Sequence, residues 1–138
     1  MATLRIVSLI IVSLFCVGCG VLDISPVPLS LNITSPQDGS TATSPVDLSF
    51  AVTGDMPDGS KPVAVIKDPL GQLWPWLHIE NLGQGNWFLP GVALGNAADC
   101  GKSFELHVVI TNENVPSSRI DVLPNGEHDS VTVTRTCE

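Results

Sequence analysis

Two stretches of the chain, residues 46–53 and 104–111, place an apolar side chain at every second position. Successive side chains of a β-strand point to opposite faces, so this period of two predicts strands with one buried face. The side chains predicted to point inward are Val46, Leu48, Phe50 and Val52 in the first stretch and Phe104, Leu106, Val108 and Ile110 in the second. We expect the two sets to face each other across two stacked sheets.

Further short segments with β-like patterns fill most of the remaining chain. Alternation or apolar runs predict strands at residues 29–34, 63–66, 72–80, 85–89, 119–123 and 131–134. The run at 63–66 is continuously apolar, which is typical of a strand buried on both faces. Pro75 lacks a backbone donor and places 72–80 at a sheet edge or on a bulge. About seven short strands separated by turn residues, with no useful helical period, predict an all-β antiparallel sandwich.

A series of short motifs follows a definite order along the chain. The motifs are Ser35-Pro36 with Gly39, Pro45-Val46, Trp74-Pro75, Gly85 with Trp87, Gly101 with Phe104 and Leu106, and Val131-Thr132-Val133-Thr134-Arg135. With this order, most of the chain is similar to the bacterial Ig-like domains of surface proteins and lipoproteins. The resemblance implies an Ig-like β-sandwich over residues 29–138 and a cell-surface or periplasmic setting. It implies no ligand, because this fold hosts many functions.

Residues 1–18 are predicted to be a secretory signal peptide. Arg5 gives the start of the chain a positive charge, residues 6–15 are almost wholly apolar, and the small residues Gly18 and Gly20 follow. This order is typical of a cleaved export signal. An uncleaved membrane anchor is the alternative, since the stretch from residue 4 to residue 22 approaches the length of about 20 apolar residues that a spanning helix needs.

The end of this segment, Cys16-Val17-Gly18-Cys19, resembles the processing site of bacterial lipoproteins, although Cys16 stands where that family usually has Leu. The resemblance implies cleavage before Cys19, a lipid on Cys19 that holds the protein to a membrane, and a tether over residues 19–28. Gly20 rather than Asp follows the cysteine, which by the same resemblance favours the outer membrane or the cell surface. Ordinary cleavage near Gly18 or Gly20 would instead release a soluble periplasmic or secreted protein.

Cys100 and Cys137 are the two cysteines outside the N-terminal segment. In an oxidising compartment such a pair favours a disulfide, which would stabilise the fold by roughly 4 kcal/mol on the chain-entropy model. Two free thiols or a metal-binding pair are the alternatives, but the spacing of the two cysteines matches no zinc pattern.

Charge and motifs argue against several functions. The chain has a net charge of −8 and only six Lys and Arg residues, which form no cluster, so we expect no nucleic-acid partner. His78, His107 and His128 lie in no metal or catalytic motif, and each is expected at the surface or at the edge of the core. The acidic residues near 55–58 and 127–129 lack the spacing of an EF-hand calcium loop. We therefore expect no catalytic residue, metal site or cofactor.

Trp74 and Trp76 share the parity of one strand face and form the candidate ligand surface. If exposed, they could stack on sugar rings or anchor a protein partner; the alternative is that they pack in the core or cover a sheet edge. Trp87 is expected to be buried. The predicted function is that of a non-catalytic cell-envelope lipoprotein that binds or spaces envelope proteins or glycans. The alternative is a carbohydrate-binding surface protein that uses Trp74 and Trp76.

Overall fold

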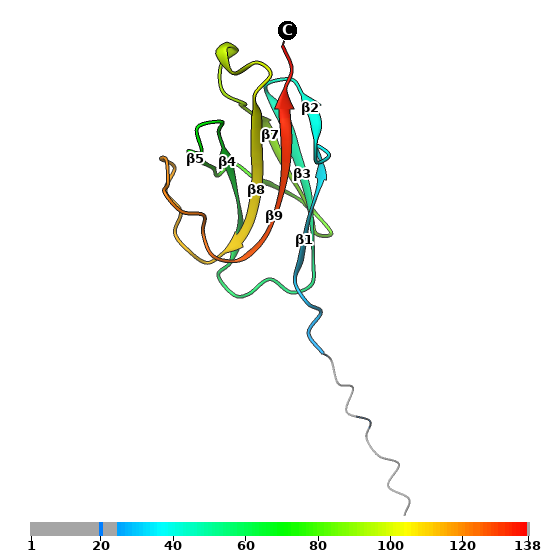
Figure 1. Cartoon of the computed structure of the whole chain (residues 1–138). Helices are drawn as coiled ribbons and strands as arrows, with labels where there is room; N and C mark the ends of the chain where they lie inside the picture. The colour runs from blue at the N-terminus through cyan, green and yellow to red at the C-terminus, as the bar shows by residue number, and fades with distance from the viewer. Residues whose placement is uncertain (1–19, 21–24, 138) are drawn as a thin grey trace, which may run out of the picture.

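Two stacked β-sheets form the body of the protein in the computed structural model, which describes residue 20 and residues 25–137 (Figure 1). The first sheet has four strands in the order β1 (Ser30–Ser35), β3 (Val46–Thr53), β7 (Asn86–Val92) and β6 (Glu80–Gly83). The second has five, in the order β2 (Ser40–Ala42), β9 (Glu127–Arg135), β8 (Ser103–Thr111), β4 (Lys61–Lys67) and β5 (Leu73–Trp76). A single turn of 3-10 helix, η1 (Ala97–Asp99), lies between β7 and β8. The predicted all-β sandwich is confirmed.

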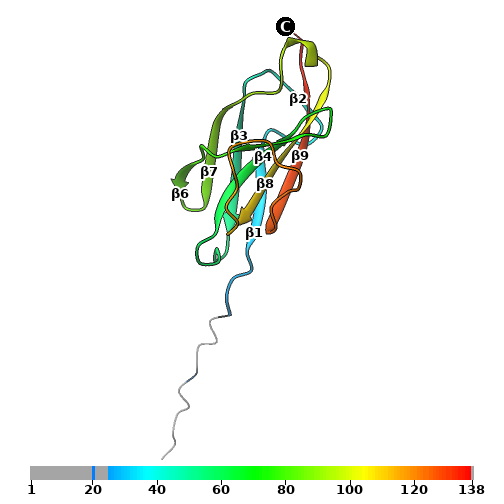
Figure 2. The same ribbon diagram turned by 90° about the vertical axis from the view of Figure 1, so that its left-hand side faces the viewer.

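The order of the strands is that of an Ig-like sandwich. Taken along the chain, β1, β3, β7 and β6 occupy the places of strands A, B, E and D of an Ig domain, and β9, β8 and β4 those of G, F and C. Figure 2 shows the two layers from the side. The short strands β2 and β6 were not predicted, because three or four residues carry too little alternation to be recognised. β2 also runs parallel to β9, whereas we expected antiparallel pairing throughout.

The side chains predicted to point inward meet between the sheets. Leu48 and Phe50 of β3, with Phe104 and Leu106 of β8, are at most 1% exposed and belong to one core cluster. Trp87, expected to be buried, is only partly so, and its ring lies parallel to that of Phe50 with 6.2 Å between the centroids. Alternation therefore assigned the inner faces of the two predicted strands with the clearest pattern, residues 46–53 and 104–111, correctly.

A second, smaller cluster lies on the outer face of the five-stranded sheet. β4 is buried on both faces, as predicted, because its outward side chains Val63 and Val65 pack with Val115, Ile120 and Leu123. These last three belong to the connection between β8 and β9, which passes beside β4 and β5 in Figure 1. This connection gives the sheet a second buried face where a sandwich ordinarily meets solvent.

The cover on the outer face overturns two predictions. Residues 119–123 form no strand and make one isolated bridge, from Ile120 to Leu73, because they cross the sheet and do not join it. His107 was expected at the surface or at the edge of the core, but it is only 6% exposed. Alternation placed His107 correctly on the outward face of β8, and the prediction was wrong because that face is itself covered.

The strand predicted at residues 72–80 corresponds to β5, and only its last residue, Glu80, belongs to β6. β5 is an edge strand of the five-stranded sheet, in agreement with Pro75, and β6 is an edge strand of the other sheet. Residues 77–79 carry the chain across from one sheet to the other. Hydrophobicity alone does not mark such a crossing.

The chain enters the sandwich at the end opposite to its C-terminus. Residues 25–29 have no regular secondary structure and lead into β1 (Figure 1). The predicted signal peptide, Cys19 and residues 21–24 of the predicted tether lie outside the described residues. Among the residues that are described, no helix is long and apolar enough to cross a membrane.

Candidate functional site

Trp74 and Trp76 lie on the inner face of the five-stranded sheet, at its edge. In the pairing of β4 with β5, Trp74 is opposite Ile66 and Trp76 is opposite Ala64, and both partners belong to the main core. Trp74 remains 45% exposed, whereas Trp76 is half-buried and packs against the core. The expectation that the two side chains share a face is confirmed. Of the two alternatives, packing in the core applies to Trp76 and exposure at the surface applies to Trp74.

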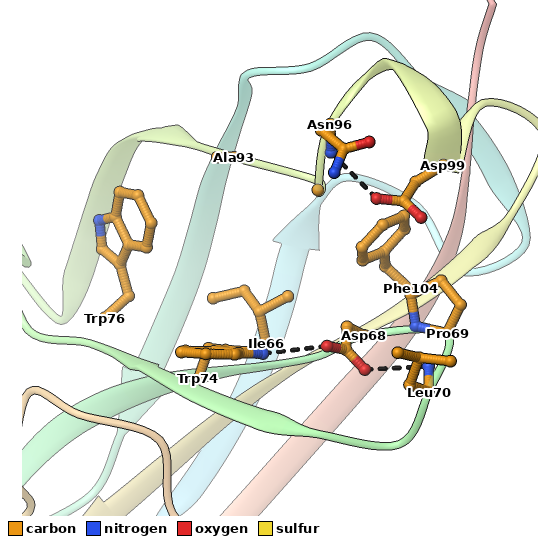
Figure 3. Close-up of a pocket in the computed structure, with 11 residues that line it drawn as sticks. Ile66, Asp68, Pro69, Leu70, Trp74, Trp76, Ala93, Asn96, Asp99 and Phe104 are labelled. Atoms are coloured by element: carbon orange, nitrogen blue, oxygen red, sulfur yellow. Dashed lines mark hydrogen bonds between the residues drawn. The ribbon is translucent and has the colours of Figure 1, made fainter.

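An open pocket of about 480 Å³ lies between this edge and the connection from β7 to β8 (Figure 3). Ile66, Trp74 and Trp76 line it from the five-stranded sheet, and the connection contributes Asn96 and Asp99. Pockets of this size commonly hold small ligands. The pocket arises because inward-facing side chains of β5 continue past the region where the two sheets close on each other.

Asp68, in the turn between β4 and β5, holds the Trp74 ring in place. Its Oδ2 accepts a hydrogen bond from the indole Nε1 of Trp74 at 3.0 Å, and its Oδ1 accepts from the backbone N–H groups of Leu70 and Gln72, both at 2.9 Å. Desolvation opposes ionisation of the carboxyl, but these hydrogen bonds outweigh it and lower the pKa of Asp68 below its ordinary value. The ring is therefore anchored at its polar edge, and 45% of the residue remains exposed for contact.

The opposite wall is a short capped helical turn. The side chain of Asn96 accepts a hydrogen bond from the Ala98 N–H at 2.8 Å, and Asp99 Oδ2 accepts from the Asn96 N–H at 3.0 Å. This reciprocal capping satisfies donors at the start of η1. The hydrogen bond from Asn96, followed by that from Lys102 at 3.1 Å, lowers the pKa of Asp99. Asp99 is thus an anion at neutral pH.

Two attachments fix this wall to the last strand. Cys100, directly after η1, forms a disulfide with Cys137, with 5.0 Å between the Cα atoms, so the predicted pairing is confirmed. The guanidinium of Arg135 on β9 donates to the backbone carbonyl oxygen of Leu94 at 2.7 Å and to that of Asn96. The wall therefore has a defined position relative to the sheet, as a preformed binding site requires.

The pocket combines aromatic surface with acceptor oxygens. Trp74, Trp76 and Phe104 supply aromatic rings, and the carboxylates of Asp68 and Asp99 stand on opposite walls (Figure 3). Among the described residues that line the pocket, none is Lys, Arg or His. Such a site can hold a ring with an apolar face and hydroxyl groups at its edge.

A chain of four hydrogen-bonded side chains lies outside the pocket, on the outer face of the five-stranded sheet. Lys67 Nζ donates to Glu105 Oε1 at 3.0 Å, and Glu105 Oε2 lies 3.0 Å from His107 Nε2. His107 Nδ1 in turn lies 2.8 Å from His128 Nε2. The hydrogen bond from Lys67 is the main cause of the lowered pKa of Glu105, and burial is the main cause of the lowered pKa of His107.

The sequence analysis did not predict this row of four hydrogen-bonded side chains, although the sequence contains one indication of it. Glu105 and His107 are two positions apart on one strand and so share a face. Their partners, Lys67 on β4 and His128 on β9, come into contact only through the strand register. The register pairs Lys67 directly with Glu105 and pairs His128 with Val109, so that His128 lies diagonal to His107. Without the register, four titratable residues with a sequence separation of 61 between the first and the last give no pattern.

The remaining candidate residues do not form a site. His78 is exposed and lies in the crossing between β5 and β6. Within residues 20 and 25–137, no group of three or more His, Cys, Asp or Glu side chains is arranged to hold a metal ion. Asp129, one of the acidic residues considered as calcium ligands, lies in β9, where it accepts a hydrogen bond from the Ile33 N–H at 2.7 Å and thereby ties β9 to β1.

Comparison with known proteins supports the fold. No protein-family model matches the chain, and no curated protein matches its sequence. Among solved structures, the endo-beta-1,4-mannanase from Thermotoga petrophila is similar, with a TM-score of 0.54 and 14% sequence identity over 83% of this chain and 21% of that chain. The chain thus spans about a fifth of that structure, and at this identity the likeness concerns the fold alone.

Proposed function

We propose that the protein is a non-catalytic binding module of the bacterial cell envelope, exported and anchored through a lipid on Cys19. The observation that carries the proposal is the exposed ring of Trp74 at the mouth of a preformed pocket. Leaving an aromatic ring of this size in water forgoes burial energy, and exposed apolar surface beside a pocket is typical of binding sites. The signal-like leader and the paired cysteines favour export.

The geometry of the chain suits a tethered module. Residues 25–29 enter at one end of the sandwich, and the turn between β4 and β5, with η1, lies towards the other end (Figure 1). A protein anchored by its N-terminus would therefore hold the pocket away from the membrane surface. In that orientation the pocket can meet ligands of the cell wall or the medium.

Co-sedimentation with purified cell-wall and envelope polysaccharides tests the binding role. The mature protein should sediment with at least one of these materials, and Trp74→Ala should lose most of this binding. Leu82→Ala is the matched control, because Leu82 is an exposed apolar residue, 63% accessible, on β6 and outside the pocket. Equal losses in the two variants, or binding that survives Trp74→Ala, would contradict the assignment of the pocket.

Carbohydrate binding is the second candidate function, and the composition of the pocket favours it. The apolar faces of Trp74 and Trp76 can stack on the apolar face of a pyranose ring, while carboxylate oxygens accept hydrogen bonds from its hydroxyl groups. Neutral and acidic oligosaccharides, β-1,4-mannan among them, can be titrated while tryptophan emission is followed. A saturable shift that disappears in Trp74→Ala and persists in Leu82→Ala supports this function, and no shift with any glycan rejects it.

A further inference from the structure

We propose that the pocket selects uncharged saccharides and rejects acidic ones, and that Asp68 and Asp99 set this selectivity from opposite walls. The inference rests on the proposed carbohydrate binding and names the class of ligand that the site would take. It follows from the charges around the pocket and from the way in which each carboxylate is held.

Both carboxylates are fixed in place by hydrogen bonds that need their negative charge or are strengthened by it. Asp68 accepts from Trp74 and from two backbone N–H groups, and Asp99 accepts from the Asn96 N–H. Each carboxylate therefore stays ionised at neutral pH and keeps its position when a ligand enters. An ionised carboxylate offers about four acceptor positions, and Trp74, Leu70 and Gln72 already take at least three of those on Asp68. Asp99 accepts from the Asn96 N–H and from Lys102 Nζ, which leaves it with lone pairs free. These lone pairs suit the hydroxyl donors of a sugar.

The positive charges near the pocket are already engaged. Lys102 pairs with Asp99 at 3.1 Å, and Arg135 donates to two backbone carbonyl groups behind the wall. None of the described lining residues is basic, so nothing in the pocket can neutralise a ligand carboxylate. An acidic sugar would bring a third negative charge beside Asp68 and Asp99, while Lys102 and Arg135 are already engaged with groups of the protein. Like charges at short range repel. A neutral sugar meets no such penalty.

The apolar side of the pocket, which includes Trp74, supplies the favourable contact with an uncharged ring. Asp68 engages the Nε1 edge of Trp74, so the exposed part of the indole, 45% of the residue, remains available for stacking. Ile66 and Phe104, which are at most 4% exposed, provide the apolar floor. An uncharged ring with one apolar face suits both the carboxylates and the apolar side chains of the pocket.

Matched pairs of ligands test the proposal. A panel of neutral hexose oligosaccharides, each accompanied by the same oligosaccharide oxidised at C6 to the uronate, is titrated by calorimetry against the mature protein. We expect a neutral member to bind and its uronate form to bind at least tenfold more weakly at low salt. Added salt should narrow this difference, because it screens charge.

Two variants connect the selectivity to the pocket. Asp99→Asn removes one charge and retains an acceptor for the Asn96 N–H, so it should reduce the discrimination against the uronate several-fold. Asp58→Asn, at an exposed position in the loop between β3 and β4, removes the same charge from another part of the surface and should leave discrimination unchanged.

The outcomes separate this inference from the function on which it rests. If a neutral glycan and its uronate bind equally, or if Asp58→Asn acts as strongly as Asp99→Asn, the selectivity is overturned and carbohydrate binding stands. If tetramethylammonium binds more tightly than every neutral glycan, the site takes cations and the saccharide class is wrong. If no glycan of the panel binds, the proposed carbohydrate function falls and this inference falls with it.

Discussion

His107 Nδ1 and His128 Nε2 lie 2.8 Å apart, and the two ring centroids are 5.1 Å apart with an angle of 13° between the ring planes. The centroid separation is close to the nitrogen–nitrogen distance plus the two ring radii, so the nitrogens lie near the line that joins the rings. This is the geometry of a hydrogen bond between ring edges. The other nitrogen of His107 donates to the Glu105 carboxylate. When His107 is neutral, its Nδ1 must therefore accept from His128.

This bond occupies the lone pair of His107 Nδ1 at the edge that the two rings share. Because that lone pair is occupied, the pair does not present it to a metal ion.

Acidification should destabilise the protein through His107. Burial lowers its pKa in the folded state, so the unfolded state takes up a proton more readily. The contribution of neutral His107 is fully present above the ordinary histidine pKa of about 6.5 and is lost as pH falls below it towards the folded-state pKa. We expect the urea midpoint to fall between about pH 7.5 and 5, well above the range in which Asp68, Asp99 and Glu105 titrate.

His107→Gln should flatten this dependence on pH, since Gln can retain hydrogen bonds but does not titrate. His78→Gln is the control, because His78 is exposed and should leave the slope unchanged. An unaltered slope in His107→Gln would mean that another group causes the loss of stability in acid.

Removing the Asp68 side chain should release the Trp74 ring and weaken the turn. Asp68→Ala leaves the indole N–H and two backbone N–H groups without their acceptor. Because these donors are exposed or part-buried and water can replace the carboxylate, the change should cost about 0.5–1.5 kcal/mol in the free energy of unfolding. Urea unfolding measures this cost, and the NMR signal of the Trp74 indole N–H should move towards that of a solvated indole. Asp58→Ala is the control, and an indole signal that stays in place would show that Asp68 does not hold the ring.

The disulfide should stabilise the fold and also the wall of the pocket. Replacing Cys100 and Cys137 together by Ala opens a loop with a sequence separation of 37, which should cost about 4 kcal/mol on the chain-entropy model. Because Cys100 directly follows η1, ligand binding in the pocket should weaken under conditions in which the variant is still folded. Stability equal to that of the parent protein would contradict the structural role of the bond.

Lipid attachment at Cys19 can be tested by metabolic labelling with palmitate in a bacterial host. The parent protein should incorporate label and fractionate with membranes, whereas Cys19→Ala should lose the label and accumulate as precursor. Cys16→Ala is a close control, because it changes a cysteine three positions earlier, within the segment predicted to be removed. Label that persists in Cys19→Ala would reject the anchor and favour release as a soluble protein.

Much of the fold could be predicted because a strand records its environment locally. Alternation at Phe50 and Phe104 gave the correct inner faces, the apolar run that contains Val65 gave a strand buried on both sides, and Pro75 indicated an edge. Each of these signals depends only on neighbouring residues and on the pleat of the backbone.

For the candidate site, the sequence correctly placed Trp74 and Trp76 on one face of a strand, whereas the pocket around them was not foreseen. Its opposite wall comes from Asn96 and Asp99, 20 or more residues further along the chain, and reaches the tryptophans only when the sheets stack. The alternation within one strand carries no information about contacts with residues that lie so far away in the sequence.

The sequence by itself determined which side chains share a face, because side-chain direction follows from the backbone period. Only the tertiary structure decided what covers each face. His107 points outward as its parity requires, yet it is buried because its face of the sheet is covered. Trp74 points inward, yet it is exposed because the opposite sheet ends before it. Burial depends on what packs against a face, and that partner is chosen by contacts between segments far apart in the chain.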